Sequence, residues 1–373
     1  MSSVAPSPQF PPGSTYAVPE ARRGETFAPA ASTPYDRLPR TLRWAWWRPL
    51  VALGVGLVVC FLGSALVVGG GMLAMYLAGE LTSAADVDAL LERMLTLDAT
   101  DTFVLVISLG SIAIWLLAVP VALRVAGMRP KGHISSVALR LRWSWMGLCA
   151  LVAVLALVVS FGLSLGLGAL VGDAVSPEWT PWSRLWLPLL VVLLLVPFQA
   201  AAEEYVFRGF LVQALGSWLP RGIWPRVVVV VVPSLAFVFS HGYGLWGLLD
   251  VGVFAATAMW LTLRTGGLEA AIALHVVNNV VVFGMLASGA LGTTVNGASE
   301  GSLASLLITA ISSIGFAWAV ESLARRRGIA RYSTWPQRET AAPLAIALPH
   351  PVASWQGGDP MGTSTRVANT QNA

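Results

Sequence analysis

The chain has 373 residues, of which 56% are hydrophobic and only 11% are charged, and its formal net charge at pH 7 is +4. A soluble domain carries about 25% charged residues, so this composition excludes an ordinary soluble protein and predicts an all-α, polytopic membrane helix bundle. Basic residues of membrane proteins gather at the cytoplasmic ends of helices, so we expect no nucleic-acid partner. The two cysteines, Cys60 and Cys149, lie in apolar segments and indicate no disulfide framework.

The chain divides into three parts by composition. Residues 1–42 are rich in Pro, Ser and Ala and lack an early apolar run, which predicts a disordered cytoplasmic tail without a signal peptide. Residues 43–324 carry the apolar segments and predict the transmembrane bundle. Residues 325–373 begin with ARRRG and predict a second disordered tail.

Apolar windows of about 20 residues predict eight transmembrane helices, because each spanning segment must satisfy its own backbone hydrogen bonds. They lie at about 50–77, 103–123, 143–171, 185–219, 227–241, 245–263, 268–289 and 303–323. The fifth is the weakest, since it is short and ends in HGYG.

The charges of the loops predict the orientation of these helices. The second connection carries Arg124, Arg129, Lys131, Arg140 and Arg142. The first is acidic, with Glu80, Asp86, Asp88 and Glu92. Positive loops mark the cytoplasmic side, so both termini are predicted to be cytoplasmic. Abundant Ala, Val and Trp indicate a bacterial chain, and therefore the bacterial plasma (inner) membrane.

Ionisable residues inside predicted spans are the candidates for function, because each costs about 2.5–3.5 kcal/mol on insertion scales. Asp250 in the sixth span is a minor candidate, whereas His133 falls in a basic loop and is predicted to be solvated. The main candidates are Glu203, Glu204 and Arg208 in the fourth span, His241 at the end of the fifth, and His275 in the seventh. Asn279, whose side chain is an uncharged amide, joins them because it lies close to His275 in the seventh span.

Helical spacing assigns unequal roles to the charges of the fourth span. Glu204 and Arg208 are four residues apart and share a helix face, so Arg208 is predicted to neutralise Glu204. Glu203 is then the freer carboxylate, available for proton transfer or metal binding. His275 and Asn279 are also four residues apart and can point into one cavity.

The length of the fourth helix decides whether these groups can meet. If the helix continued to Leu219, Glu203 would lie about 24 Å from the cytoplasmic end and could approach His241. If it ended at Arg208, the depth would be only about 8 Å. We expect the longer helix, with its cytoplasmic boundary near Pro220.

Such a group of residues can activate water in two ways. Glu203 can act as general base with a histidine assisting, while His275 and Asn279 donate hydrogen bonds to an oxyanion. Alternatively, Glu203, His241 and His275 can hold a divalent metal such as zinc. The sequence does not choose between a metal and none, so the cofactor stays open.

A non-enzymatic function is the competing hypothesis, in which the same residues form a buried polar network of a transporter or scaffold. A transporter is expected to show internal repeats with broken helices in both halves. The polar groups all lie in the second half of the chain, which speaks against a transporter.

Three motifs in this region resemble a known family. EEYVFR, FVFSH and HVVNN are similar, in order and spacing, to the E-E-x-x-x-R, F-x-x-x-H and H-x-x-x-N/B motifs of the CPBP family. This family contains the type II CAAX endopeptidases and the Abi proteins, which process bacteriocins or confer immunity to them. The resemblance covers roughly residues 185–285, which we interpret as the protease core.

The resemblance implies an intramembrane endopeptidase with a bundle of eight helices. Its substrate would be a membrane-associated peptide or protein in the lipid bilayer, and the alternative within the family is a non-proteolytic immunity protein. The family is described both as metalloproteases and as glutamate-dependent enzymes without a metal. Carried over by motif position, Glu203 is the water-activating glutamate, Glu204 its neighbour and Arg208 the supporting arginine, and His241, His275 and Asn279 complete the site.

Overall fold

We describe a computed structural model of residues 33–41, 44–171, 176–294 and 302–333. It is a bundle of α-helices, seven of which are long and apolar enough to cross a membrane among the described residues, so the predicted polytopic membrane bundle is confirmed. The long helices are α1 (Arg48–Leu77), α3 (Thr102–Ala113) continuing into α4 (Trp115–Val125), α5 (Trp143–Val171), α6 (Trp182–Glu204), α9 (Leu245–Thr265), α10 (Glu269–Ser288) and α11 (Leu303–Arg326).

Two helices differ from the prediction. The fifth predicted span corresponds to α8 (Ile223–Phe239), which has only 17 residues and is not among the seven described helices that are long enough to cross a membrane. An unpredicted amphipathic helix, α2 (Ala84–Thr96), connects the first two spans. It begins with a capping box in which Ser83 and Asp86 each bond the backbone of the other, which satisfies two free N–H groups.

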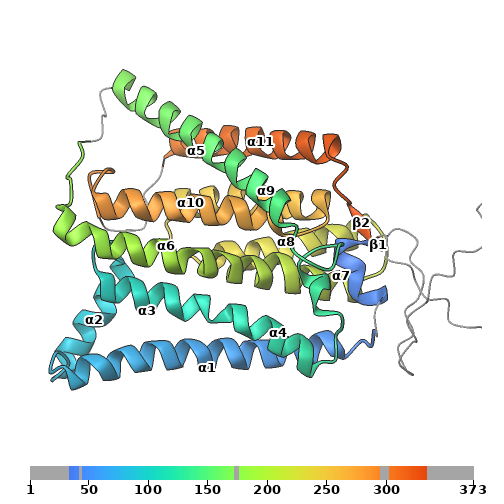
Figure 1. Ribbon diagram of the computed structural model, residues 1–373, viewed down its shortest axis with the longest axis horizontal. Coiled ribbons are helices and arrows are strands. Elements are labelled where there is room, and N and C mark those ends of the chain that lie inside the picture. The colour runs from blue at the N-terminus through green and yellow to red at the C-terminus, as the bar shows by residue number, and fades with distance from the viewer. Residues whose placement is uncertain (1–32, 42–43, 172–175, 295–301, 334–373) are drawn as a thin grey trace, which may run out of the picture.

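The helices are arranged in successive layers (Figure 1). α1 packs on α3 and α4, these pack on α6, and α6 packs on α10. α10 also contacts α5 and α9, and α11 covers α5 and α9. Thus α6 and α10, which carry most candidate site residues, lie in the middle of the bundle.

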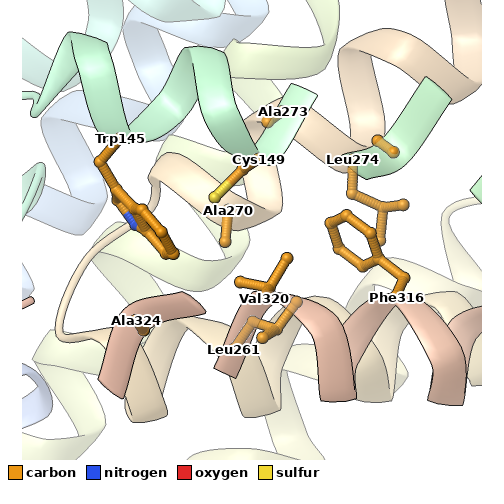
Figure 2. Packing of buried hydrophobic residues seen from close by; sticks show 10 residues of the cluster. Trp145, Cys149, Leu261, Ala270, Ala273, Leu274, Phe316, Val320 and Ala324 are labelled. Carbon is orange, nitrogen blue, oxygen red and sulfur yellow. The ribbon is translucent and has the colours of Figure 1, made fainter. Parts of the chain in front are cut away.

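The largest hydrophobic cluster lies where α5, α9, α10 and α11 meet (Figure 2). Trp145 and Cys149 of α5 lie in it beside Leu261 of α9 and Phe316 and Val320 of α11. Cys149 is a buried free thiol that fills space in this cluster, as its apolar sequence context indicates. The cluster fixes one side of α10.

The two ends of the described chain meet in a short antiparallel sheet. β1 (Thr33–Pro34) pairs with β2 (Tyr332–Ser333). The 3₁₀ helix η1 (Tyr35–Thr41) follows β1 and packs on α7 (Val212–Trp218). Both ends therefore lie on the same side of the bundle (Figure 1).

This packing corrects the predicted tails. Residues 33–41 were predicted to belong to the disordered tail 1–42, but Tyr35 and Leu38 are fully buried in the core. Likewise, α11 and β2 extend the ordered chain beyond the predicted boundary at residue 325. Composition did not reveal these segments, because each is stabilised by contacts with distant elements. The remaining parts, 1–32 and 334–373, lie outside the described residues.

His133 was wrongly predicted to be solvated. It lies in the 3₁₀ helix η2 (Lys131–Ile134), and its side chain is fully buried. Its Nδ1 atom bonds to Oε1 of Gln213, and Nε2 of Gln213 donates to the His133 carbonyl oxygen at 2.8 Å. Burial lowers the pKa of His133 from 6.5 to about 4. The basic loop is thus folded back onto the bundle.

Candidate functional site

The fourth span continues past the two glutamates as predicted. α6 leads into a π-helical segment, η3 (Tyr205–Leu211), and then into α7, so that the helix runs for 37 residues from Trp182 to Trp218. The wider π turn begins directly after Glu204, and π turns in α-helices are frequent at functional sites. Gly209 in this segment lets Ile134 approach, since a Cβ there would lie 3.2 Å from an Ile134 side-chain atom.

The predicted pair of Glu204 and Arg208 is confirmed. Nη1 of Arg208 donates to Oε1 of Glu204 at 2.9 Å, and both side chains are fully buried. The Arg208 guanidinium also lies over the ring of Phe237, 3.8 Å from its centroid. An ion pair and a cation–π contact therefore stabilise a charge that burial would otherwise disfavour.

His275 of α10 connects the two glutamates. Its Nδ1 atom is 2.7 Å from Oε1 of Glu204, and its Nε2 atom is 3.5 Å from Oε2 of Glu203. The Glu204 carboxylate, paired with Arg208, can only accept, so Nδ1 carries the proton in this bond. In the neutral ring Nε2 then has the lone pair, and it faces Glu203.

Glu203 has two unlike oxygen atoms. Oε1 accepts a hydrogen bond of 2.8 Å from Nε2 of Gln199. Oε2 has no hydrogen-bond partner among the described residues, and the side chain is 10% exposed, whereas that of Glu204 is 0% exposed. Oε2 of Glu203 is itself buried, and it faces Nε2 of His275 at 3.5 Å.

Asn279 reaches Glu203 indirectly, through Gln199. Nδ2 of Asn279 donates to Oε1 of Gln199 at 3.4 Å, and Nδ2 of Asn278 donates to Oδ1 of Asn279 at 3.1 Å. The sequence motifs do not predict Gln199 or Asn278 as site residues. Gln199 could have been found from its position, four residues before Glu203 on the same helix face.

His275 and Asn279, the predicted oxyanion donors, are both engaged with protein groups in this structure. Both ring nitrogens of His275 face glutamates. The Asn279 amide is directed to Gln199. Both groups thus belong to the polar network around the two carboxylates.

His241 lies just after α8, beside this network. Its Nδ1 atom donates to the Phe237 carbonyl oxygen at 2.8 Å, which leaves the lone pair of a neutral ring on Nε2. The Phe237 ring contacts the rings of both His241 and His275, with centroid distances of 4.8 and 5.8 Å. In the part of the chain described, His241 forms no hydrogen bond or ion pair with either glutamate.

The predicted metal ligands are not assembled into a metal site. Within the described ranges, no three His, Cys, Asp or Glu side chains are grouped so that they could hold a metal ion. The set Glu203, His241 and His275 therefore does not fit a metal in this arrangement. Asp250, the minor candidate, interacts with Ser305 and Thr309 of α11 instead.

A cavity of about 730 Å³ lies on another face of the contact between α6 and α10. Its walls are mostly apolar and come mainly from α4, η2, α5, α6 and α10, with Ala201 of α6 and Tyr205 of η3 among the lining residues. Glu203, Glu204 and His275 are not among its lining residues. This cavity is thus separate from the polar network.

Comparison with known proteins identifies the same segment. Residues 184–281 match the family described as type II CAAX prenyl endopeptidase Rce1-like. This match confirms the resemblance to the CPBP family that the motifs predicted. The uncharacterized protein YyaK of Bacillus subtilis (strain 168) is 31% identical over 102 residues. That alignment spans 26% of this chain and only 33% of YyaK. No solved structure matches.

Proposed function

We propose that this chain, whose residues 184–281 belong to the CPBP family, is an intramembrane endopeptidase that cleaves a membrane-associated peptide or protein. The observation that carries the proposal is the position of His275 between Glu203 and Glu204. The family match supports a protease of the CAAX type, and the long apolar helices support action within the membrane.

The reaction we propose uses Glu203 as the general base. Oε2 of Glu203 accepts a proton from water as the water oxygen attacks the carbonyl carbon of the scissile bond. Glu203 then returns this proton to the amine nitrogen as the C–N bond breaks, giving a carboxyl group and an amine. Nε2 of His275 can hold the proton between these steps, because it faces the same oxygen at 3.5 Å.

The other residues hold this pair in place. Glu204 fixes the tautomer of His275 by accepting from its Nδ1–H, in the way a carboxylate orients the histidine of a catalytic triad. Arg208 keeps Glu204 ionised, and Phe237 packs against Arg208 and both histidines. We assign His241 a role beside the substrate carbonyl, because its ring adjoins Phe237 without being engaged by a glutamate.

We further propose that the membrane is the bacterial plasma membrane, with both termini in the cytoplasm. The pairing of β1 with β2 supports a common side for both ends. Basic residues on the connection between α4 and α5 support a cytoplasmic location of that side.

The test is cleavage by the full chain purified in detergent and returned to lipid vesicles. A library of membrane-associated peptides would be incubated with the protein, and the products would be identified by mass spectrometry. The variant Glu203→Gln is expected to lower the cleavage rate by about 10²- to 10⁴-fold. Glu92→Gln, which changes an exposed glutamate of α2, serves as the matched control and is expected to cleave normally. Equal cleavage by Glu203→Gln and the unchanged protein would refute the proposal.

A further inference from the structure

Gln199 lies outside all three family motifs, yet it touches the proposed general base. It is 5% exposed and lies on α6, one helical turn before Glu203. Its Nε2 atom donates to Oε1 of Glu203 at 2.8 Å. A buried amide that bonds a carboxylate costs desolvation free energy unless both of its ends are satisfied.

The other end of the Gln199 amide is also engaged. Its Oε1 atom accepts from Nδ2 of Asn279, and Oδ1 of Asn279 in turn accepts from Nδ2 of Asn278. The chain of amides runs from α10 to α6 and always points its N–H groups toward Glu203. Turning the Gln199 amide over would place its oxygen against a carboxylate oxygen and its NH₂ group against that of Asn279. Only one orientation of Gln199 is therefore compatible with its neighbours.

We infer that Gln199 is a positioning residue for Glu203, which holds Oε1 so that Oε2 faces Nε2 of His275. Asn279 then acts on the Glu203 carboxylate indirectly, through its hydrogen bond to Gln199. This inference rests on the proposed function for its catalytic consequence, but the hydrogen bond itself can be tested without any substrate.

The first measurement is kinetic. Gln199→Leu keeps the approximate size of the side chain and removes both hydrogen bonds. Loss of a hydrogen bond to a charged group predicts a fall in kcat of about 10- to 100-fold. KM is expected to change by less than about twofold, because Gln199 orients the base and does not bind substrate.

The matched control is Gln213→Leu. Gln213 is another buried glutamine of the same continuous helix, but it bonds to His133. We expect this variant to lower the thermal midpoint and to leave kcat unchanged. Equal losses of kcat in the two variants, or an unchanged kcat in Gln199→Leu, would overturn the inference by showing only a structural role.

The second measurement is independent of activity. The carboxyl infrared band of Glu203 is identified as the band that disappears in Glu203→Gln. In Gln199→Leu this band is expected to shift, because its hydrogen bond is lost, whereas in Gln213→Leu it stays in place. A band that does not move in Gln199→Leu overturns the inference. If no peptide is cleaved in a Glu203-dependent manner, the proposed function fails, and the infrared result still decides the role of Gln199.

Discussion

Nδ1 of His275 lies 2.7 Å from Oε1 of Glu204, so a histidine of α10 is bonded to the carboxylate that Arg208 also holds. Oε1 of Glu204 thus accepts two hydrogen bonds. One comes from His275, 71 residues away in the sequence, and the other comes from Arg208, four residues away. This oxygen couples the α6–η3 helix to α10.

Glu204→Gln is expected to lower kcat by about 10²- to 10⁴-fold, because an amide no longer fixes the proton on Nδ1 of His275. The change keeps the shape of the side chain and leaves Glu203 in place. Cleavage rates of the purified variant, compared with those of Glu92→Gln at equal folded yield, test this. A Glu204→Gln enzyme with normal kcat would show that the bond to His275 has no part in the reaction.

Arg208→Met is expected to destabilise the protein by about 3–5 kcal/mol, since it leaves the Glu204 carboxylate buried without its ionic partner. The free energy of unfolding in detergent measures this loss. The double variant Glu204→Gln/Arg208→Met is expected to recover part of it, because the unpaired charge is gone.

The control for this pair is Arg93→Met. Arg93 forms an ion pair with Asp101, but its side chain is 48% exposed, so we expect a change of no more than about 1 kcal/mol. Equal losses of unfolding free energy for Arg93→Met and Arg208→Met would contradict the larger contribution to stability expected of the buried pair.

The stability of the protein is expected to depend on the ionisation of His133. Its pKa is lowered from 6.5 to about 4 in the folded state, so the unfolded state binds the proton more tightly. Stability is therefore lost as the pH falls through the window from about 6.5 to about 4, and the penalty is complete below it, at about 3 kcal/mol.

Thermal midpoints between pH 7 and pH 4 measure this effect. His133→Asn can still donate to Gln213 but does not titrate, so its midpoint is expected to fall less over the same window. Parallel curves for the two proteins would show that His133 does not contribute to the acid sensitivity.

Tyr35→Ala is expected to cost about 3–5 kcal/mol of stability, because the ring is fully buried in the cluster around Val212, Met259 and Leu268. Tyr35→Phe removes only the hydrogen bond from the hydroxyl to the Ile134 carbonyl oxygen and is expected to cost about 1 kcal/mol. Tyr76→Ala on α1 is the control, since that ring is 64% exposed. Unchanged unfolding of Tyr35→Ala would mean that residues 33–41 are not part of the folded core.

The sequence predicted those features that depend on neighbours along the chain. The membrane bundle followed from apolar windows, and the pairing of Glu204 with Arg208 followed from their spacing of four residues. The extension of the fourth helix past Arg208 was expected because only the longer helix would bring Glu203 near His241, and the helix does continue to Trp218. The first two features are decided by hydrophobicity and helix geometry, which are local properties.

Only the tertiary structure decided which distant groups touch. It placed His275 against both glutamates, turned Asn279 to Gln199, buried His133 against Gln213, and packed residues 33–41 into the core. In each case the partners are far apart in sequence, and the contact depends on how the helices are rotated and on how deep each residue lies in the bundle. Hydropathy and motif spacing estimate the depth of a residue along its own helix, but they do not determine how the helices are rotated against one another, because that rotation is set by the simultaneous packing of several helices. The different surroundings of Glu203 and Glu204 are instead local, since Gln199 and Arg208 each lie four residues from their carboxylate along the same helix.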